Sequence, residues 1–107
     1  MKTKPVSFYE RRASIAKALG HPSRLMIVEA LQEKELCVCE LTDLVGADQS
    51  TVSRHLSVLK SAGLVDTRKE GSMIFYRLRV RCLEGFFSCV ETVLRENLER
   101  EEALVGT

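Results

Sequence analysis

Residues 41–63 read LTDLVGADQSTVSRHLSVLKSAG, and this stretch decides the fold. Its first half predicts a short helix, because three apolar residues have the i, i+3, i+4 spacing of one helix face: Leu41, Leu44 and Val45. Gly46 ends this helix, and Asp48 is a good N-cap for the next one. The second helix has an apolar stripe at i, i+4, i+7: Val52, Leu56 and Leu59. Two helices joined by so short a turn are typical of a helix-turn-helix.

The sequence on either side predicts further elements. These are helices over about residues 8–19, 22–33 and 83–103, and strands over about 64–69 and 73–78. The two strand runs are rich in β-branched and aromatic residues and flank Glu70-Gly71-Ser72, which predicts a β-hairpin. The last helix is amphipathic, and its apolar side consists of Phe86, Phe87, Val90, Val93, Leu94 and Leu98.

The predicted order is α-α-α-α-β-β-α, a mainly α fold with a small β-hairpin. This is the order of a winged helix-turn-helix, in which the hairpin forms the wing. A chain of 107 residues is long enough for one compact domain with a core and too short for two. We therefore expect a single domain over residues 1–107, with the helix-turn-helix at about 41–62 and the wing at about 64–79.

The composition is that of an ordinary globular protein, with 45% hydrophobic and 29% charged residues. No apolar run approaches the roughly 20 residues that cross a bilayer, and residues 1–12 lack the apolar core of a signal peptide. We expect a cytoplasmic protein with no membrane partner. In that setting the four cysteines stay reduced, so they need a role other than a disulfide.

The net charge hides how the charges are distributed. The sum is only +1, which seen alone argues against a nucleic-acid partner. Residues 49–79, however, carry six basic and two acidic side chains, whereas residues 25–48 carry one basic and six acidic ones. Residues 83–107 carry two basic and six acidic ones. A fold that gathers residues 49–79 on one face would present the basic patch that phosphate binding requires.

Three stretches resemble one protein family. They are ALGHPSR over residues 18–24, ELCVCEL over residues 35–41 and QSTVSRHL over residues 49–56. With these motifs in this order, the chain resembles the ArsR/SmtB family of metal-sensing winged-helix repressors, closest to the arsenic-responsive type. The resemblance implies a homodimer, joined through the helices at 8–19 and 83–103, that leaves operator DNA when an effector binds. Two-fold symmetry would make that operator an imperfect inverted repeat.

The second helix of the helix-turn-helix is the one expected to read DNA. Its apolar stripe turns inward, which leaves hydrogen-bonding side chains for the DNA: Gln49, Ser50, Thr51, Ser53, Arg54, Ser57 and Lys60. Gln and Arg can bond adenine and guanine edges at two points, and Ser can bond bases or phosphates. Gln49, Ser53 and Arg54 are therefore the first candidates for base contacts.

The wing and one histidine add further candidates. Arg68 and Lys69 lie beside the tip of the hairpin, where two positive charges would meet phosphates or a flanking minor groove. His55 lies beside the apolar Leu56, so it either contacts DNA or satisfies a local hydrogen bond.

Cys37 and Cys39 form a Cys-x-Cys pair just before the helix-turn-helix. This spacing puts both side chains on one side of an extended segment but about 200° apart on an α-helix. Both thiolates can therefore bind one ion only if the start of the helix is unwound or distorted. Soft ions match thiolates, so we expect As(III) or Sb(III) as the effector, with Cd(II), Pb(II) and Zn(II) as alternatives.

The chain departs from the arsenic-sensor pattern at one position. That pattern has a third cysteine where this chain has Thr42, so a further ligand would come from Cys82, Cys89, a partner chain, solvent or a small thiol. Residues 1–36 contain no cysteine, which disfavours a cadmium sensor that draws ligands from an N-terminal arm. Residues 83–107 contain neither Asp nor His, which disfavours the family's zinc, cobalt or nickel site on the last helix.

The preferred hypothesis is a homodimeric repressor that As(III) or Sb(III) releases from its operator by binding Cys37 and Cys39. A second hypothesis keeps DNA binding but replaces the metal with a disulfide or polysulfide of a dithiol, as in a redox or persulfide sensor. A thiol enzyme would need a base beside the cysteine, and with only His21 and His55 available we expect no enzyme. An interaction module that has lost DNA binding would lack the charged face of the second helix.

Overall fold

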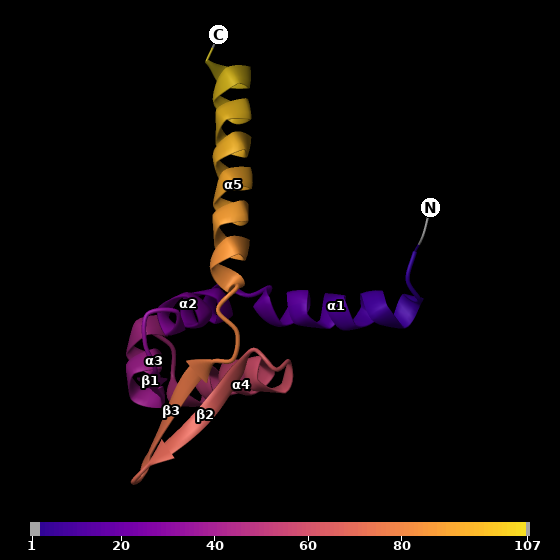
Figure 1. Cartoon of the computed structure of the whole chain (residues 1–107). Coiled ribbons are helices and arrows are strands. Elements are labelled where there is room, and N and C mark those ends of the chain that lie inside the picture. Colours follow the sequence, from indigo (N-terminus) through magenta and orange to yellow (C-terminus); the bar gives the residue numbers. More distant parts are fainter. Residues whose placement is uncertain (1–2, 107) are drawn as a thin grey trace.

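The computed structural model describes residues 3–106, and the order of its elements confirms the predicted winged helix-turn-helix (Figure 1). The predicted domain also includes residues 1, 2 and 107, which lie outside the described ones. The elements are α1 (Val6–Leu19), α2 (Pro22–Leu31), β1 (Leu36–Cys37), α3 (Val38–Val45), α4 (Gln49–Ser61), β2 (Val65–Glu70), β3 (Met73–Leu78) and α5 (Leu83–Val105). The strand β1 is the one element that the sequence pattern does not predict.

The core lies where α2, α3 and α4 meet beside the base of the wing. Its fully buried side chains are Ile27, Val28, Leu31, Leu41, Val52, Leu56, Leu59 and Val65. The stripe predicted for α4 is therefore confirmed as the face that anchors this helix. Gly46 ends α3 in the left-handed region, at φ 76°, where a residue without a Cβ is favoured, and so permits the tight turn into α4.

The wing is an antiparallel hairpin of β2 and β3 in unbroken register. On its other side, β3 pairs with β1, so that Leu36 lies opposite Tyr76 and Cys37 opposite Phe75, and the sheet order is β1-β3-β2. A strand of two residues has no periodicity of its own, which explains why the sequence pattern misses it. Its consequence is that the segment leading into α3 is tied to the wing.

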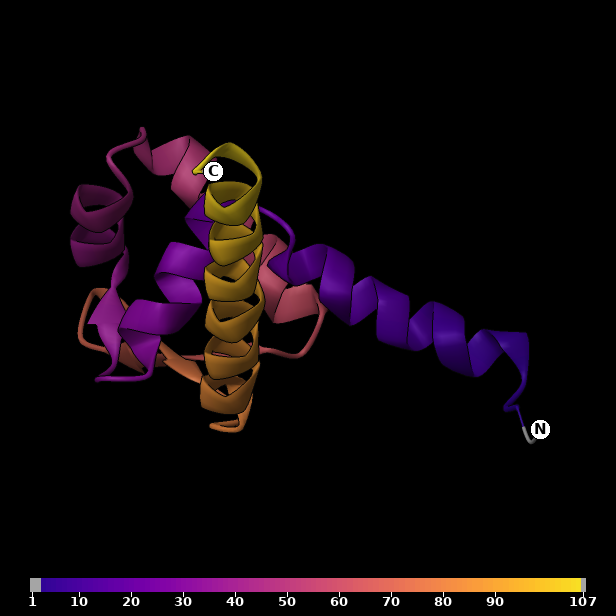
Figure 2. The same ribbon diagram turned by 90° about the horizontal axis from the view of Figure 1, so that it is seen from above.

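Two helices extend in different directions from the body of the protein, which consists of α2, α3, α4 and the three-stranded sheet. α5 stands clear of it, and only Leu83 at its start is buried (Figure 1). α1 extends outward and buries only Ala18 and Leu19 at its end (Figure 2). The radius of gyration is 17.1 Å, against about 13 Å for a compact domain of this length. None of the helices within residues 3–106 combines the length and apolar character needed to cross a membrane.

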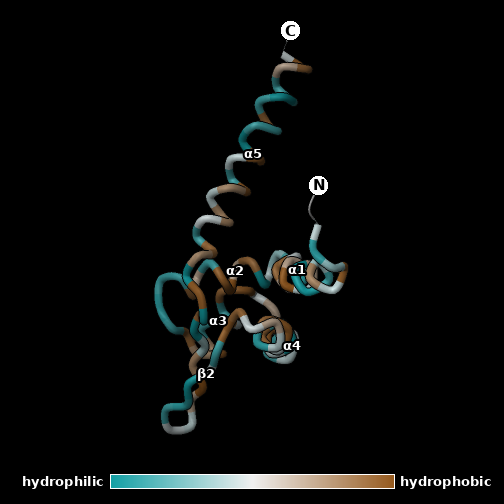
Figure 3. The backbone as a smooth tube through the Cα atoms, turned by 45° about the vertical axis from the view of Figure 1, so that its right-hand side comes forward, coloured by the Kyte–Doolittle hydropathy of each residue, from teal (hydrophilic) through white to brown (hydrophobic). Residues whose placement is uncertain are grey.

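Both of these helices carry exposed apolar side chains, which on α1 are Val6, Tyr9 and Ile15. Along α5 the tube changes between apolar and polar residues within single turns (Figure 3), in accordance with the predicted amphipathic helix. Its exposed apolar side chains are Phe86, Val90, Val93, Leu94, Leu98, Leu104 and Val105. Cys89 on this helix is exposed within one chain, so it is not part of the core.

Candidate DNA interface and cysteine site

α4 presents a polar side to solvent, opposite its buried stripe. The exposed members of the predicted DNA-reading set are Gln49, Ser50, Ser53, Arg54, Ser57 and Lys60. Thr51 is half-buried. Donors and acceptors on one side of a helix that is anchored by apolar residues on the other are what major-groove reading requires.

The start of α4 is organised by Asp48. This residue is the N-cap in extended conformation, as predicted, but its carboxylate accepts hydrogen bonds from the hydroxyls of Ser50 and Thr51 rather than from backbone N–H groups. These two hydroxyls lower the pKa of Asp48 below its ordinary value. Asp48 therefore orients two of the side chains predicted to contact DNA.

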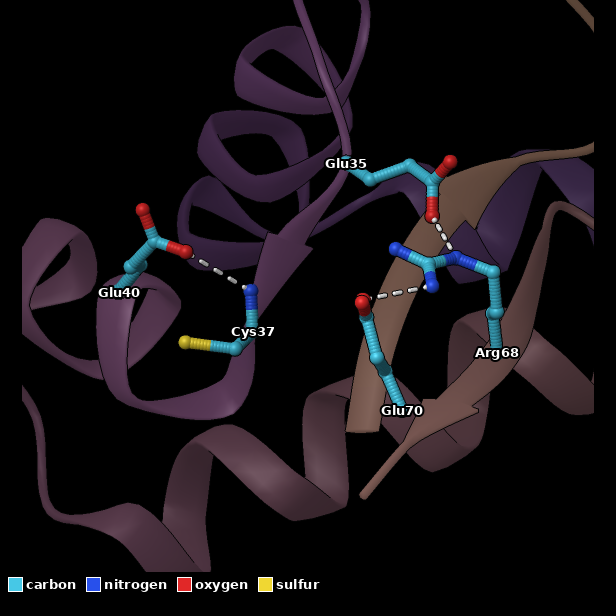
Figure 4. Close-up of polar contacts among 5 residues, drawn as sticks. All are labelled: Glu35, Cys37, Glu40, Arg68 and Glu70. Carbon is cyan, nitrogen blue, oxygen red and sulfur yellow. Dashed lines mark hydrogen bonds and ion pairs between the residues drawn. The ribbon is translucent and has the colours of Figure 1, made fainter. Parts of the chain in front are cut away.

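The two wing cations differ in their surroundings. Lys69 is exposed, whereas the half-buried Arg68 forms ion pairs with Glu35 and Glu70, each at 2.9 Å (Figure 4). The guanidinium of Arg68 also lies 4.9 Å from the centre of the Phe75 ring. The two carboxylates raise the pKa of Arg68 above its ordinary value. Arg68 would have to leave Glu35 and Glu70 to reach a phosphate, whereas Lys69 has no such partner within residues 3–106.

His55 does not share the exposed face of α4. Its Nδ1 lies 3.2 Å from Nη1 of Arg24, and its ring centre lies 4.4 Å from that of His21. Burial lowers the pKa of His55, and the neighbouring His21, Arg24 and Arg54 lower it further. The local hydrogen bond is thus present in the structure, and a DNA contact of His55 stays a prediction.

Cys37 lies at the junction of three elements. It is buried at 5% exposure, ends β1 and is the N-cap of α3. With Glu40 it forms a capping box, in which the Cys37 backbone N–H donates to Glu40 Oε1 at 3.1 Å (Figure 4). That backbone N–H is the main cause of a lowered pKa of Glu40, and the Cys37 side chain and Lys34 lower it further.

Cys37 and Cys39 line one hollow of about 230 Å³ between α3, the start of α4 and the wing. The other residues around it are Val38, Gln49, Ser72, Met73 and Ile74. Cys37 is in extended conformation and Cys39 is in the first turn of α3, so the pair spans the start of this helix, and the separation of about 200° within a regular helix does not describe it. Met73 adds a thioether to the hollow, a soft donor that the sequence reasoning missed.

The other two cysteines are not part of this hollow. Cys82 precedes α5 and Cys89 lies within it, and both are exposed. Within residues 3–106, no group of three or more His, Cys, Asp or Glu side chains is placed to hold a metal ion. The structure therefore brings together the predicted pair and leaves the source of a further ligand as a prediction.

Arg24 is a second residue near the site to which the sequence reasoning assigned no role. It belongs to the stretch of residues 18–24 that carries part of the family resemblance, and it contacts α4 through His55. The only signal in the sequence is this motif, because the contact joins residues 31 positions apart.

A polar helix face anchored beside a two-stranded wing defines a winged helix-turn-helix DNA-binding protein. Residues 21–67 match the model of the bacterial regulatory protein, arsR family. An uncharacterized HTH-type transcriptional regulator of Methanocaldococcus jannaschii is 49% identical over 69 residues, which cover 64% of this chain and 78% of that protein. The chain belongs to the arsR family.

Two further comparisons describe its relatives. The cadmium resistance transcriptional regulatory protein CadC of Listeria innocua is 42% identical over 64 residues, which cover 59% of this chain and 54% of that protein. A solution structure of the homodimeric winged helix-turn-helix DNA-binding domain of a possible ArsR-family regulator from Mycobacterium bovis matches with a TM-score of 0.76 and 31% identity, over 94% of this chain and 95% of that one. Members of this family are transcriptional regulators, so the thiol-enzyme hypothesis is set aside.

Proposed function

We propose that this protein is a cytoplasmic, homodimeric transcriptional repressor that leaves its operator when a soft metal ion binds Cys37 and Cys39. As(III) or Sb(III) is the proposed effector, with Cd(II), Pb(II) and Zn(II) as alternatives. The observation that carries the proposal is the position of Cys37, which is buried, caps α3 and pairs with the wing strand β3.

The dimer is supported by the uncovered apolar sides of α1 and α5. Contiguous apolar surface of this kind marks an interaction site. α5 is 23 residues long and buries only Leu83, so most of its apolar side is available to a second copy. The homodimeric relative from Mycobacterium bovis supports the same arrangement. Two copies related by a two-fold axis would read an imperfect inverted repeat.

Metal binding would cause release from DNA because it changes the interactions that Cys37 makes in the metal-free protein. Coordination of one ion by both residues would draw the Cys37 thiol from its position as the N-cap of α3 toward Cys39 in the first turn of this helix. Binding would therefore disturb both the capping box at Glu40 and the pairing of β1 with β3, so α3 and the wing change together. The ion shifts the protein away from the DNA-binding state only by its difference in affinity for the two states.

The donor set favours a soft ion but leaves one ligand to be found. Two cysteines and Met73 line the hollow, and thiolates and thioethers are the ligands of soft metals. The relative named for cadmium resistance supports a metal effector in general. For As(III), a third thiolate would come from Cys82, Cys89, a partner chain or a small thiol.

A mobility-shift experiment tests this function with a DNA duplex that the wild-type protein has selected from a random-sequence library. Arsenite, antimonite and Cd(II) are added to the wild type, to Cys37→Ser/Cys39→Ser and to Cys82→Ser/Cys89→Ser, which tests the possible further ligands. Serine is itself a good N-cap, so it keeps the cap of α3 and removes the soft ligand. We expect arsenite to release the wild type and the double variant at 37 and 39 to stay on DNA.

The outcomes separate the alternatives. If arsenite still releases Cys37→Ser/Cys39→Ser, the proposed site is wrong. Release by a persulfide or oxidant and not by any of the three metals would favour the redox sensor. A loss of the arsenite response in Cys82→Ser/Cys89→Ser would show that these thiols complete the site.

A further inference from the structure

Arg24 connects three elements through one guanidinium group. Its Nε donates to the Ala18 carbonyl at 2.6 Å and its Nη2 to the Lys17 carbonyl at 3.5 Å, both in the last turn of α1. Its Nη1 lies 3.2 Å from Nδ1 of His55 on α4. Arg24 itself sits in the first turn of α2. It therefore bonds the Ala18 carbonyl at the end of α1, adds to the bond that the Lys17 carbonyl accepts from the Gly20 N–H, and also holds a residue of the DNA-reading helix.

The geometry defines which nitrogen of His55 carries the proton. An arginine can only donate, so Nδ1 of His55 accepts and the proton of the neutral ring is on Nε2. The ring is backed by His21, whose own Nδ1 accepts a hydrogen bond from the Ser23 backbone N–H at the start of α2. Both histidines are thus acceptors in the same small cluster.

The charged side chains beside His55 are cationic. Two hollows of about 520 Å³ and about 250 Å³ adjoin it between α1, α2 and α4. The charged residues lining them within residues 3–106 are Lys17 of α1, Arg24 of α2 and Arg54 of α4, and no carboxylate is among them. A positive charge on His55 would therefore have no acidic partner here. Protonation would also remove the acceptor that Arg24 uses.

We propose that Arg24 is a positioning residue for sequence-specific DNA binding, because it fixes the orientation of α4 by joining His55 to the carbonyl end of α1. Arg54, a candidate for base contact, directly precedes His55 on α4, so a rotation of this helix moves it relative to the base edges. A lysine cannot replace Arg24, because its single ammonium does not reach three acceptors in the fixed fork of a guanidinium. The inference does not depend on the identity of the effector.

The same contact makes specific binding sensitive to acid. Protonation of Nδ1 in His55 breaks the bond to Arg24 and places a charge beside His21, Arg24 and Arg54. The folded protein favours the neutral form of His55, so the bond to Arg24 and the orientation of α4 persist at neutral pH. It is lost as the pH falls below the ordinary range of histidine titration, near 6.5.

The experiment compares binding to the selected duplex with binding to a scrambled duplex by fluorescence anisotropy at fixed salt. Arg24→Lys should weaken specific binding about tenfold, as loss of a hydrogen bond to a charged group does, and scrambled binding less than about twofold. Arg81→Lys is the matched control, because Arg81 also donates to a helix-end carbonyl, that of Gln32 at 2.8 Å, but makes no hydrogen bond to α4 within residues 3–106. It should leave both affinities unchanged.

Variants at position 55 separate positioning from direct contact. His55→Asn keeps an acceptor near Nδ1 and does not titrate, so it should retain specific affinity and lack the decline below about pH 6.5 that we expect of the wild type. His55→Leu removes the acceptor, and combining it with Arg24→Lys should cost no more than either change alone. Additive losses, equal losses on both duplexes, or an acid decline that persists in His55→Asn would each overturn the proposal.

Discussion

The body and the two outer helices bury apolar residues in different ways. In the body, α2, α3 and α4 enclose side chains that are 0% exposed, such as Ile27, Leu41 and Leu56. On α5 the same kind of residue stays in solvent, with Leu94 at 61% and Leu104 at 83% exposure. The body is thus complete within one chain, whereas the outer helices need a further surface. Apolar residues of one sequence can therefore serve two ends, self-contained folding in the body and association on the outer helices.

The largest expected effect is on the body. Leu56→Ala removes a fully buried side chain and should lower the free energy of unfolding by about 3 kcal/mol, because a cavity adds to the lost transfer free energy. Val58→Ala on the exposed side of the same helix should cost less than about 1 kcal/mol. Urea unfolding at one protein concentration measures both, and equal losses would contradict the contrast between the two sides of α4.

The second expected effect is on the outer helices. Leu94→Glu/Leu98→Glu places charges on the apolar side of α5 and should weaken dimerisation by about 100-fold, since charges at a packed apolar interface are left without partners. Sedimentation over a dilution series measures the change. Glu91→Gln/Glu99→Gln on the same helix serves as a control. A dimer that survives the charged variant would show that this side of α5 serves another purpose.

Two glycines should respond in opposite directions to the same substitution. Gly46→Ala places a Cβ at φ 76° in the turn of the helix-turn-helix and should destabilise the protein by about 1 kcal/mol. Gly85→Ala lies inside α5, where a Cβ meets nothing within 4 Å, and should stabilise by about 0.5 kcal/mol through helix propensity. Thermal unfolding at equal protein concentration measures both signs.

The smallest expected effect is the loss, at acid pH, of the stability that Asp48 contributes at the start of α4. The pKa of Asp48 is lowered by the hydroxyls of Ser50 and Thr51, so its contribution to stability is present above its ordinary pKa near 3.8 and is lost as the pH falls through the lower folded-state value. In Ser50→Ala/Thr51→Val, the carboxylate resonance of Asp48 should titrate closer to the ordinary value. An unchanged titration would show that other groups hold this carboxylate.

The fold could be predicted where the sequence has local periodicity. The stripe through Val52, Leu56 and Leu59 needs only the helical repeat, and the wing strands need only alternation and a turn at Gly71. Helix ends differ by two residues or fewer, as at Val6 in α1, because frayed ends carry little signal. The strand β1 could not be predicted, because Tyr76, the partner of its residue Leu36, lies far along the chain.

The candidate site was predictable in its residue types and not in its contacts. The Cys-x-Cys spacing singles out Cys37 and Cys39, but the cap that Cys37 provides with Glu40 depends on where α3 begins. The bond between Arg24 and His55 depends on the packing of α2 against α4, and no spacing rule contains it. Met73 joins the hollow only because the wing folds back beside α3.

The outer edge of the wing affects whether these molecules aggregate at high local concentration. β2 has a neighbour on one side only, and an open strand edge is a template on which another chain can add a strand. Four of its six residues are charged: Asp66, Arg68, Lys69 and Glu70. Charged side chains along an edge strand oppose the addition of another strand, so repressors gathered on neighbouring sites stay separate molecules. The side chains of this strand therefore protect against aggregation as well as shaping the wing.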